Sequence, residues 1–220
     1  MDTEIHRDRF AAERQNMVAS QLRARGIHDE RVLAAMERVP RHEFVAERFH
    51  DRAYEDHPIP IAEGQTISQP YIVAFMLESL TLEPNSKVLE VGTGSGYQTA
   101  LLAELSGYVT SIERIPGLAQ EAQSTLPRLG YGNVNIIVGD GSQGLPDAAP
   151  YDAIIVAAAA PRVPPALFEQ LAENGRMVIP VGLPDAQELQ LVRKLNGRPM
   201  IQRLEGCRFV PLIGAQGYAG

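Results

Sequence analysis

From residue 87 onward, short apolar runs alternate with segments in which apolar positions recur at helical spacing. The runs predict strands over residues 87–91, 108–113, 133–138, 151–157 and 176–181. The intervening segments predict helices that reach about residue 106, that cover 116–129, and that run from about 165 to 172 before Asn174-Gly175. Apolar strands that alternate with helices are typical of a parallel sheet covered on both faces.

The helical pattern stops after residue 182. Two stretches, 188–195 and 200–210, flank the pair Asn196-Gly197. An Asn-Gly pair in this position is a strong signal of a β-hairpin. We therefore expect a mostly parallel α/β sheet that ends in antiparallel strands, with the order of the last two strands left open.

Residues 8–40 look helical, with a first helix that ends near Gly26. Asp29 can cap a second helix, and Pro40 stops it. Residues 41–64 are irregular, and Pro70 suits the first turn of another helix. We expect one domain over 1–220, in which residues 1–80 form an N-terminal helical extension and residues 81–220 form the α/β core.

A glycine turn, Gly92-Thr93-Gly94-Ser95-Gly96, follows the first strand of the core. Glycines let a ligand approach the backbone, and the following helix directs unpaired N–H groups toward an anionic part of that ligand. The order is G-x-G-x-G, whereas the dinucleotide fingerprint is G-x-G-x-x-G. Tyr97 stands where the third glycine of that fingerprint belongs. The pattern also includes Glu90 within the strand.

Acidic residues end the next two strands. Glu113 lies seventeen residues after Gly96, near the spacing at which a carboxylate accepts hydrogen bonds from ribose hydroxyls. Asp140 lies between Gly139 and Gly141, where it can accept from an adenine amino group or shape a turn. Because ligands bind beyond the carboxyl ends of strands in open α/β sheets, these ends predict a nucleotide site. Small residues at 157–160 leave room for it.

Two polar residues lie outside the strand ends. From the residues alone, Ser68 before Gln69-Pro70 favours a helix-capping hydroxyl over a substrate contact. His57, which precedes a proline, favours a structural role over that of a base. No cluster of Cys, His and Asp has metal-binding spacing, so we expect no metal.

Composition narrows the class of protein. The chain has 220 residues, a net charge of −7 and no basic run, so we expect no nucleic-acid partner. No apolar run has the length of a membrane span, and no apolar segment follows the N-terminus. Cys207 is the only cysteine, which excludes an internal disulfide and fits a reducing compartment. We expect a cytoplasmic monomer without membrane contact.

The motif E-x-G-x-G-x-G resembles motif I of methyltransferases that use S-adenosylmethionine, which have a Rossmann-like fold. From about residue 17 onward the chain resembles the protein-L-isoaspartate O-methyltransferase family. The similar segments are R-V-P-R-H-E-F-V (38–45), P-I-P-I-A-E-G-Q-T-I-S-Q-P-Y (58–71), V-L-E-V-G-T-G-S-G-Y (88–97), G-D-G (139–141), P-Y-D-A-I-I-V (150–156), V-I-P-V-G (178–182) and R-F-V-P-L (208–212). The Q-T-I-S-Q-P stretch is the discriminating one, because many methyltransferases share motif I.

The resemblance implies specific roles for these residues. It makes Ser68 the catalytic residue, in place of the capping interpretation. It implies that S-adenosylmethionine, and its product S-adenosylhomocysteine, is bound by Gln65, Thr66, Ile67, Glu90, Gly92, Gly94, Ser95, Gly96, Glu113, Arg114, Asp140 and Gly141. It places the peptide substrate against Ile61, Ser68, Phe209, Val210 and Pro211, with 209–212 as a strand. Ser142 departs from the bulky residue expected there, which loosens the rim of the site.

The resemblance also implies a reaction: methylation of the free α-carboxylate of isoaspartyl residues in damaged proteins and peptides, followed by repair through a succinimide. Three alternatives remain. The first is a methyltransferase that acts on a small metabolite. The second is a nicotinamide-dependent dehydrogenase, which Tyr97 argues against. The third is a non-catalytic adenosine-binding module, which the intact Gln65–Pro70 segment argues against.

Overall fold

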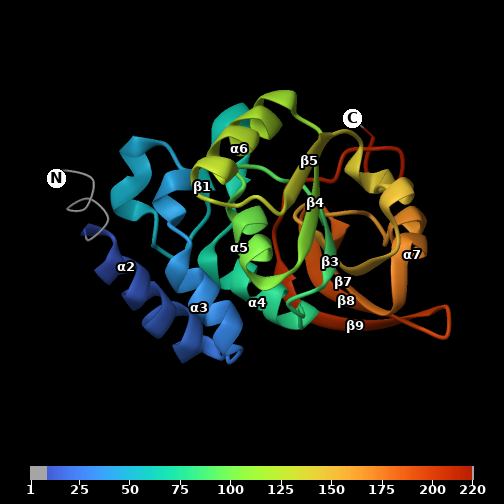
Figure 1. Cartoon of the computed structure of the whole chain (residues 1–220). Coiled ribbons are helices and arrows are strands. Elements are labelled where there is room, and N and C mark those ends of the chain that lie inside the picture. The colour runs from blue at the N-terminus through green and yellow to red at the C-terminus, as the bar shows by residue number, and fades with distance from the viewer. Residues whose placement is uncertain (1–8, 220) are drawn as a thin grey trace.

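The structure is a computed structural model, and it describes residues 9–219 (Figure 1). Its helices are α2 (Ala11–Asn16), α3 (Glu30–Arg38), α4 (Pro70–Leu80), α5 (Tyr97–Leu105), α6 (Pro116–Arg128) and α7 (Pro165–Gln170). Its strands are β1 (Ile59–Pro60), β2 (Thr66–Ile67), β3 (Lys87–Val91), β4 (Tyr108–Glu113), β5 (Val134–Val138), β6 (Tyr151–Val156), β7 (Leu171–Leu183), β8 (Ala186–Leu195) and β9 (Arg198–Cys207). Within the described residues, no helix is both long enough and apolar enough to cross a membrane.

Seven strands form one sheet in the order β5-β4-β3-β6-β7-β8-β9. The pairs from β5 to β7 are parallel, and β8 and β9 are added antiparallel. This confirms the predicted mostly parallel sheet with antiparallel C-terminal strands. Asn196 and Gly197 both have positive φ, +51° and +70°, as a two-residue hairpin turn requires. Two successive hairpins therefore decide the order of the last strands.

The sheet separates two apolar cores, because successive side chains of a strand point to opposite faces. Val88 packs in the core that includes residues of α4, α5 and α6. The next residue, Leu89, packs in the core that includes Leu167 of α7. Figure 1 shows α4 and α5 on one side of the sheet and α7 on the other. Both faces are thus buried, as the apolar strands predict.

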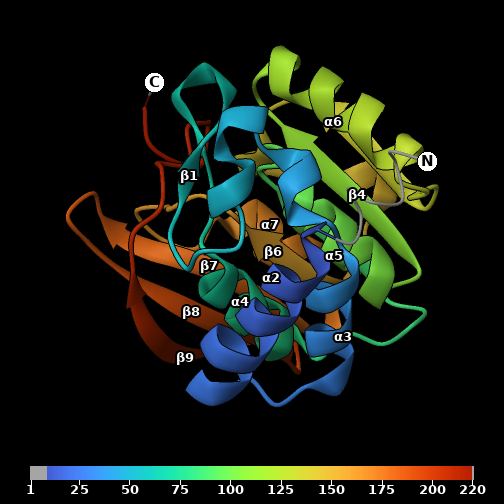
Figure 2. The same cartoon turned by 90° about the vertical axis from the view of Figure 1, so that its left-hand side faces the viewer.

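The N-terminal elements form an additional layer over α4 and α5 (Figure 2). The first helical segment continues from α2 through a π-helical turn and ends at Gly26, whose φ is +95°. The Asp29 carboxylate accepts from the backbone N–H of Arg31 and Val32 at the start of α3. Residues of this layer belong to the same buried apolar cluster as α5, which makes its packing continuous with the sheet.

Two element boundaries differ from the predictions. Helix α7 ends at Gln170, not near residue 172, because the buried Leu171 is already part of β7, where it pairs with Tyr151 of β6. Asn174, with φ +65°, interrupts the register of this pairing. Strand β9 ends at Cys207, so the prediction of a strand to residue 210 is wrong.

Residues 209–212 are not a regular strand either. They leave the sheet edge and run beside Ala159, whose N–H donates to the Val210 carbonyl at 2.8 Å. The Leu212 N–H donates to the Ala159 carbonyl at 2.7 Å. These two bonds bring the segment across the carboxyl end of β6, toward the predicted site.

Candidate active site

A cavity of about 390 Å³ lies beyond the carboxyl ends of β3, β4 and β6. One wall is the glycine turn, and another wall is the stretch Gln65–Ser68, here called the acceptor segment. Of the residues predicted to form the site, those that line this cavity are Gln65, Thr66, Ile67, Ser68, Gly92, Gly94, Ser95, Glu113, Arg114, Gly141, Val210 and Pro211. Those that do not line it are Ile61, Glu90, Gly96, Asp140 and Phe209.

The glycine turn depends on left-handed backbone geometry. Gly92, Gly94 and Gly96 have φ of +93°, +54° and +90°, values that side chains with a Cβ rarely adopt. Gly96 precedes α5 and faces α6, where an added Cβ would lie 3.3 Å from that of Ala122. It therefore shapes the turn from behind. An added Cβ on Gly94 would instead meet Ile61 at 3.8 Å, which places Ile61 beside the turn.

Glu90 lies fully buried behind the glycine turn. Its carboxylate accepts from the Gln98 amide at 3.0 Å, the Thr99 hydroxyl at 2.5 Å and the Ser111 hydroxyl at 2.6 Å. Burial raises the pKa of Glu90 to about 7, against the opposite effect of these three donors. The residue ties α5 to β4 and so fixes the backbone of the turn.

Glu113 lines the cavity at the end of β4 and is 5% exposed. One carboxylate oxygen accepts from the Gly94 N–H at 2.9 Å, and the other accepts from the Ile115 N–H at 3.0 Å. Each oxygen keeps a further acceptor position. The side chain thus closes the turn and can also receive two vicinal hydroxyls.

Asp140 lies next to the cavity, but its carboxylate binds the residues that follow it and the C-terminal segment at Ala215. One of its oxygens accepts from the Ser142 N–H and hydroxyl, and the other accepts from Gln143 and from the Ala215 N–H. Partial burial would raise the pKa of Asp140, but these hydrogen bonds outweigh it and lower the pKa. Because each oxygen already accepts twice, Asp140 borders the site through its neighbour Gly141, which lines the cavity.

Ser142, noted as a departure from the expected bulky residue, is fully buried. Its hydroxyl donates to Asp140 at 2.7 Å and accepts from the Gln216 N–H at 3.0 Å. The loosening of the rim stays a prediction. The serine fastens the C-terminal segment against the end of β5.

The acceptor segment reaches the cavity just before α4. The first residue of α4 is Pro70, and the residue before the helix is Gln69, which makes no side-chain capping bond. Asp56 caps the helix from another loop, accepting from the Tyr71 N–H at 2.9 Å. The capping interpretation of Ser68 is therefore wrong. Ser68 lines the cavity, and its hydroxyl forms no hydrogen bond with another group of residues 9–219.

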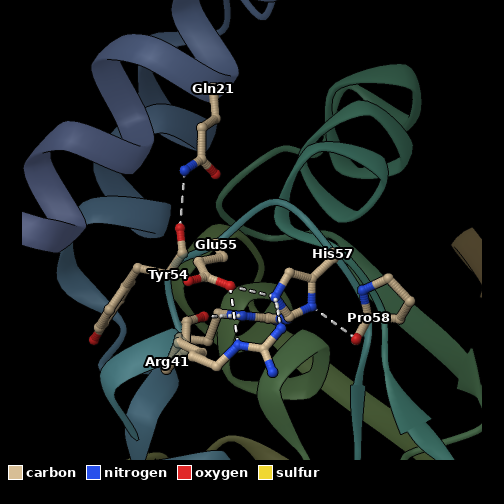
Figure 3. A network of polar contacts seen from close by, with 8 residues as sticks. Gln21, Arg41, Tyr54, Glu55, His57 and Pro58 are labelled. Carbon is tan, nitrogen blue, oxygen red and sulfur yellow. Dashed lines mark hydrogen bonds and ion pairs between the residues drawn. The ribbon is translucent and has the colours of Figure 1, made fainter. Parts of the chain in front are cut away.

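His57 does not line the cavity. Its ring nitrogen lies 2.6 Å from Glu55 and 3.1 Å from Arg52 (Figure 3). This is the structural role expected for it. Within residues 9–219, no group of three or more His, Cys, Asp and Glu side chains is arranged to hold a metal ion.

Several lining residues were not identified from the sequence. They include Val73, Tyr97, Gln98, Ile112, Ile115, Leu118 and Ile213. Tyr97 argues against a dinucleotide site and belongs to the motif V-L-E-V-G-T-G-S-G-Y, but neither pattern predicts that it lines the cavity. Most of these residues are close to a predicted strand end or helix start, which could have suggested a place near the site. That position does not show whether a side chain points toward the ligand or away from it.

The fold and the cavity together define a class of protein. A mostly parallel seven-stranded sheet carries a left-handed glycine turn after its first parallel strand and an acidic residue after the next. The cavity between them has lining glycines for close approach and a carboxylate for vicinal hydroxyls, which fits S-adenosylmethionine. This is the arrangement of an S-adenosylmethionine-dependent methyltransferase with a Rossmann-like fold.

Comparison with known proteins gives the family. The family model for protein-L-isoaspartate(D-aspartate) O-methyltransferase matches residues 12–217. A protein-L-isoaspartate O-methyltransferase from Koribacter versatilis is 60% identical over 96% of this chain and 95% of its own length. The chain belongs to the protein-L-isoaspartate O-methyltransferase family.

Solved structures agree with this assignment. A protein-L-isoaspartate O-methyltransferase superposes with a TM-score of 0.84 at 30% identity, covering 92% of this chain and 67% of the other. A second, from Plasmodium falciparum, was assigned to the same activity and contains S-adenosyl-L-homocysteine. Its TM-score is 0.79 at 31% identity, over 91% of this chain and 98% of the other. The predicted fold, family and cofactor are confirmed.

Proposed function

We propose that this chain transfers the methyl group of S-adenosylmethionine to the free α-carboxylate of L-isoaspartyl residues in damaged proteins and peptides. One observation supports this most directly: the acceptor segment, with Ser68, and the glycine turn line the same cavity. Membership of the family supports the choice of acceptor over a small metabolite.

The cofactor is assigned to the glycine-turn side of the cavity. Glu113 receives the ribose hydroxyls, with Gly92, Gly94, Ser95 and Arg114 around it. Gln65, Thr66, Ile67 and Gly141, which also line the cavity, border the rest of the cofactor. Glu90, Gly96 and Asp140 act indirectly, because they hold the backbone that lines the cavity. When bound, the sulfonium of the cofactor supplies an activated methyl group.

The acceptor is assigned to the Ser68 side. An α-carboxylate is already ionised at neutral pH, so the chain needs no strong general base. The Ser68 hydroxyl donates a hydrogen bond to one carboxylate oxygen and orients the other. Val210 and Pro211 form the apolar rim, with Ile61 beside Gly94, and this rim helps to exclude water from the carboxylate. Phe209 precedes Val210 and packs against the larger apolar cluster.

The product is a methyl ester, which explains how methylation leads to repair. The backbone nitrogen that follows the isoaspartyl residue attacks the ester carbonyl, and methanol leaves with the proton from that nitrogen. The succinimide that results opens with water at either carbonyl. One of the two openings restores a normal aspartyl residue.

Two peptides test the proposal. One contains isoaspartate, the other normal aspartate at the same position, and both are incubated with methyl-labelled S-adenosylmethionine. We expect label in the isoaspartyl peptide alone, released by mild base as methanol. Label in neither peptide, with cofactor binding intact by calorimetry, would contradict the proposal and favour the small-metabolite alternative.

The organisation of the chain is part of the same proposal. We assign residues 1–220 to a single methyltransferase domain, since one apolar cluster includes both α3 and α5. We also propose a cytoplasmic monomer that binds neither nucleic acid nor membrane, on the basis of its net charge of −7 and single cysteine. Light scattering after gel filtration tests the monomer.

A further inference from the structure

Arg41 is the largest side chain that the fold buries completely. A buried charge is costly unless it is paired, and within residues 9–219 Arg41 forms no ion pair. Its Nη1 atom has no hydrogen-bond partner there either. Burial lowers the pKa of Arg41, yet a guanidinium stays protonated at neutral pH. The fold therefore holds in its interior a positive charge that has no ion pair within residues 9–219; the Tyr97 ring and the charge of Asp56 offset the effect of its burial only in part.

The guanidinium joins three segments of the chain. Its Nε donates to the Ala53 carbonyl at 2.8 Å, and its Nη2 donates to the Ser68 carbonyl at 2.8 Å. Its central carbon lies 4.7 Å from the centre of the Tyr97 ring, which lines the cavity directly after the glycine turn. Figure 3 shows Arg41 beside the stretch that carries Tyr54, Glu55 and His57. Arg41 thus links the N-terminal layer to both walls of the cavity.

The nearby carboxylates are already paired with other cations. Glu55 contacts Arg52 and His57, and Asp56 pairs with Arg25. Their charges are therefore partly neutralised. An anion that enters the cavity beside Ser68 would approach Arg41 from the far side of the acceptor segment. In a site that excludes water, such a charge acts more strongly than it would in solvent.

Building on the proposed function, we propose that Arg41 is a positioning residue for the acceptor carboxylate. Its two hydrogen bonds fix the Ser68 backbone and thereby aim the hydroxyl. Its unpaired charge favours an anionic acceptor over a neutral one of the same shape. The side chain does not line the cavity, so its hydrogen bonds act through Ser68 and its charge acts through space.

Two variants separate the hydrogen bonds from the charge. Arg41→Lys keeps the positive charge but cannot donate to both carbonyls. Arg41→Gln can still donate to one carbonyl but is neutral. Arg31→Gln is the matched control, because Arg31 also bridges two backbone carbonyls, those of Leu82 and Leu105, and does not line the cavity.

The readout is binding of two fluorescent peptides in the presence of S-adenosylhomocysteine. One peptide has the isoaspartyl α-carboxylate, and the other has an α-carboxamide in its place. We expect the wild-type chain to prefer the acid on the order of tenfold. Arg41→Gln should reduce this ratio to near one. Arg41→Lys should weaken binding of both peptides but keep most of the ratio, and Arg31→Gln should keep it fully.

The outcomes are distinguishable. A purely structural Arg41 would lower both affinities equally in Arg41→Gln, and an unchanged ratio would overturn the proposal. Should Arg41→Gln fail to fold, Arg41→Lys decides, because wild-type affinities in that variant would exclude positioning by the two hydrogen bonds. Methyl transfer to the acid peptide by the wild-type chain is measured first. Its absence would overturn both the proposed function and this role.

Discussion

The two walls of the cavity are held in place in different ways. The glycine turn is fixed from within the sheet and the helix that follows it, by Glu90 on Thr99 and Ser111 and by Glu113 on the Gly94 N–H. The acceptor segment has only a two-residue backbone ladder, in which Thr66 and Ile67 of β2 pair with β1. Arg41 holds the Ser68 carbonyl and Asp56 caps the helix that follows, and both come from the N-terminal layer.

Because of this difference, the two walls of the cavity should respond differently to mutation. Strand register places the groups of the glycine turn, so they persist as long as the sheet persists. A two-residue β ladder and side-chain bonds across loops place the acceptor segment, and these open at a lower free-energy cost than the seven-stranded sheet. We therefore expect that changes in the N-terminal layer impair acceptor binding while cofactor binding survives. The following predictions test this contrast, from the largest expected effect to the smallest.

Ser68→Ala removes the hydroxyl proposed to orient the acceptor. We expect kcat/KM for an isoaspartyl peptide to fall on the order of a hundredfold, because misalignment of a reacting group costs about that much. Binding of S-adenosylhomocysteine by calorimetry should be unchanged. Ser79→Ala, whose hydroxyl bonds to the Phe75 carbonyl within α4, is the control. Normal turnover of Ser68→Ala would remove Ser68 from the mechanism.

Glu113→Gln tests the other wall. An amide places a donor where an oxygen now accepts from the Gly94 or Ile115 N–H, and it weakens any bond from ribose. We expect the Kd for S-adenosylhomocysteine to rise about tenfold or more, as for a lost hydrogen bond to a charged group. The KM for peptide at saturating cofactor should change little. Glu104→Gln on α5 controls for loss of a carboxylate, and an unaltered Kd in Glu113→Gln would contradict its assignment.

Acidification tests the N-terminal layer through His42. Its ring stacks on Phe10 at 4.3 Å and contacts the Tyr54 hydroxyl at 2.7 Å. Burial lowers the pKa of His42 to about 4, below the ordinary value of 6.5. The neutral ring therefore contributes stability that is complete above the unfolded pKa and is lost as pH falls toward 4.

We expect this histidine to account for about 1 kcal/mol of the stability lost between about pH 8 and about pH 5.5. Denaturant unfolding of the wild type and of His42→Gln measures the difference, and the variant should show the smaller dependence on pH. Hydrogen exchange should show α3 opening before β3 and β4. Equal loss of protection in the layer and the sheet would contradict the contrast between the two walls.

Asp56→Ala removes the cap that α4 receives from a distant loop. We expect a loss of about 1 kcal/mol in the free energy of unfolding, typical of a lost cap. The KM for peptide should also rise a few-fold, since the cap is close to Ser68. Asp29→Ala is the matched control, because Asp29 caps α3 and does not line the cavity. A rise in KM for both variants would mean that general destabilisation is the cause.

Much of the wall formed by the glycine turn could be predicted from local sequence pattern. The apolar strands, the glycine turn and Glu113 follow one another at short spacing, and each is constrained by the same backbone pairing. The pattern did not show that Glu90 and Gly96 face away from the cavity. Their orientation depends on which neighbours, Ser111 or Ala122, pack against them in three dimensions.

The role of the acceptor segment could be predicted only from the family resemblance. Local rules assigned Ser68 to a helix cap, because Ser68 lies just before a proline that suits a first helical turn. That assignment failed because Asp56, fifteen positions before Tyr71 in the chain, supplies the cap. Local rules also could not predict the contact of Ser142 with Gln216, because Gln216 lies 74 positions further along the chain.

Local pattern was enough to predict the succession of strands and helices in the core, the hairpin at Asn196-Gly197 and the position of the glycine turn. These depend on periodicity and on backbone conformations that few residues adopt, which are local properties. Only the tertiary structure decided where the buried Arg41 is directed and how the C-terminal segment closes on Asp140. Such contacts join residues far apart in the chain, and no local preference records which partner a buried polar group will find.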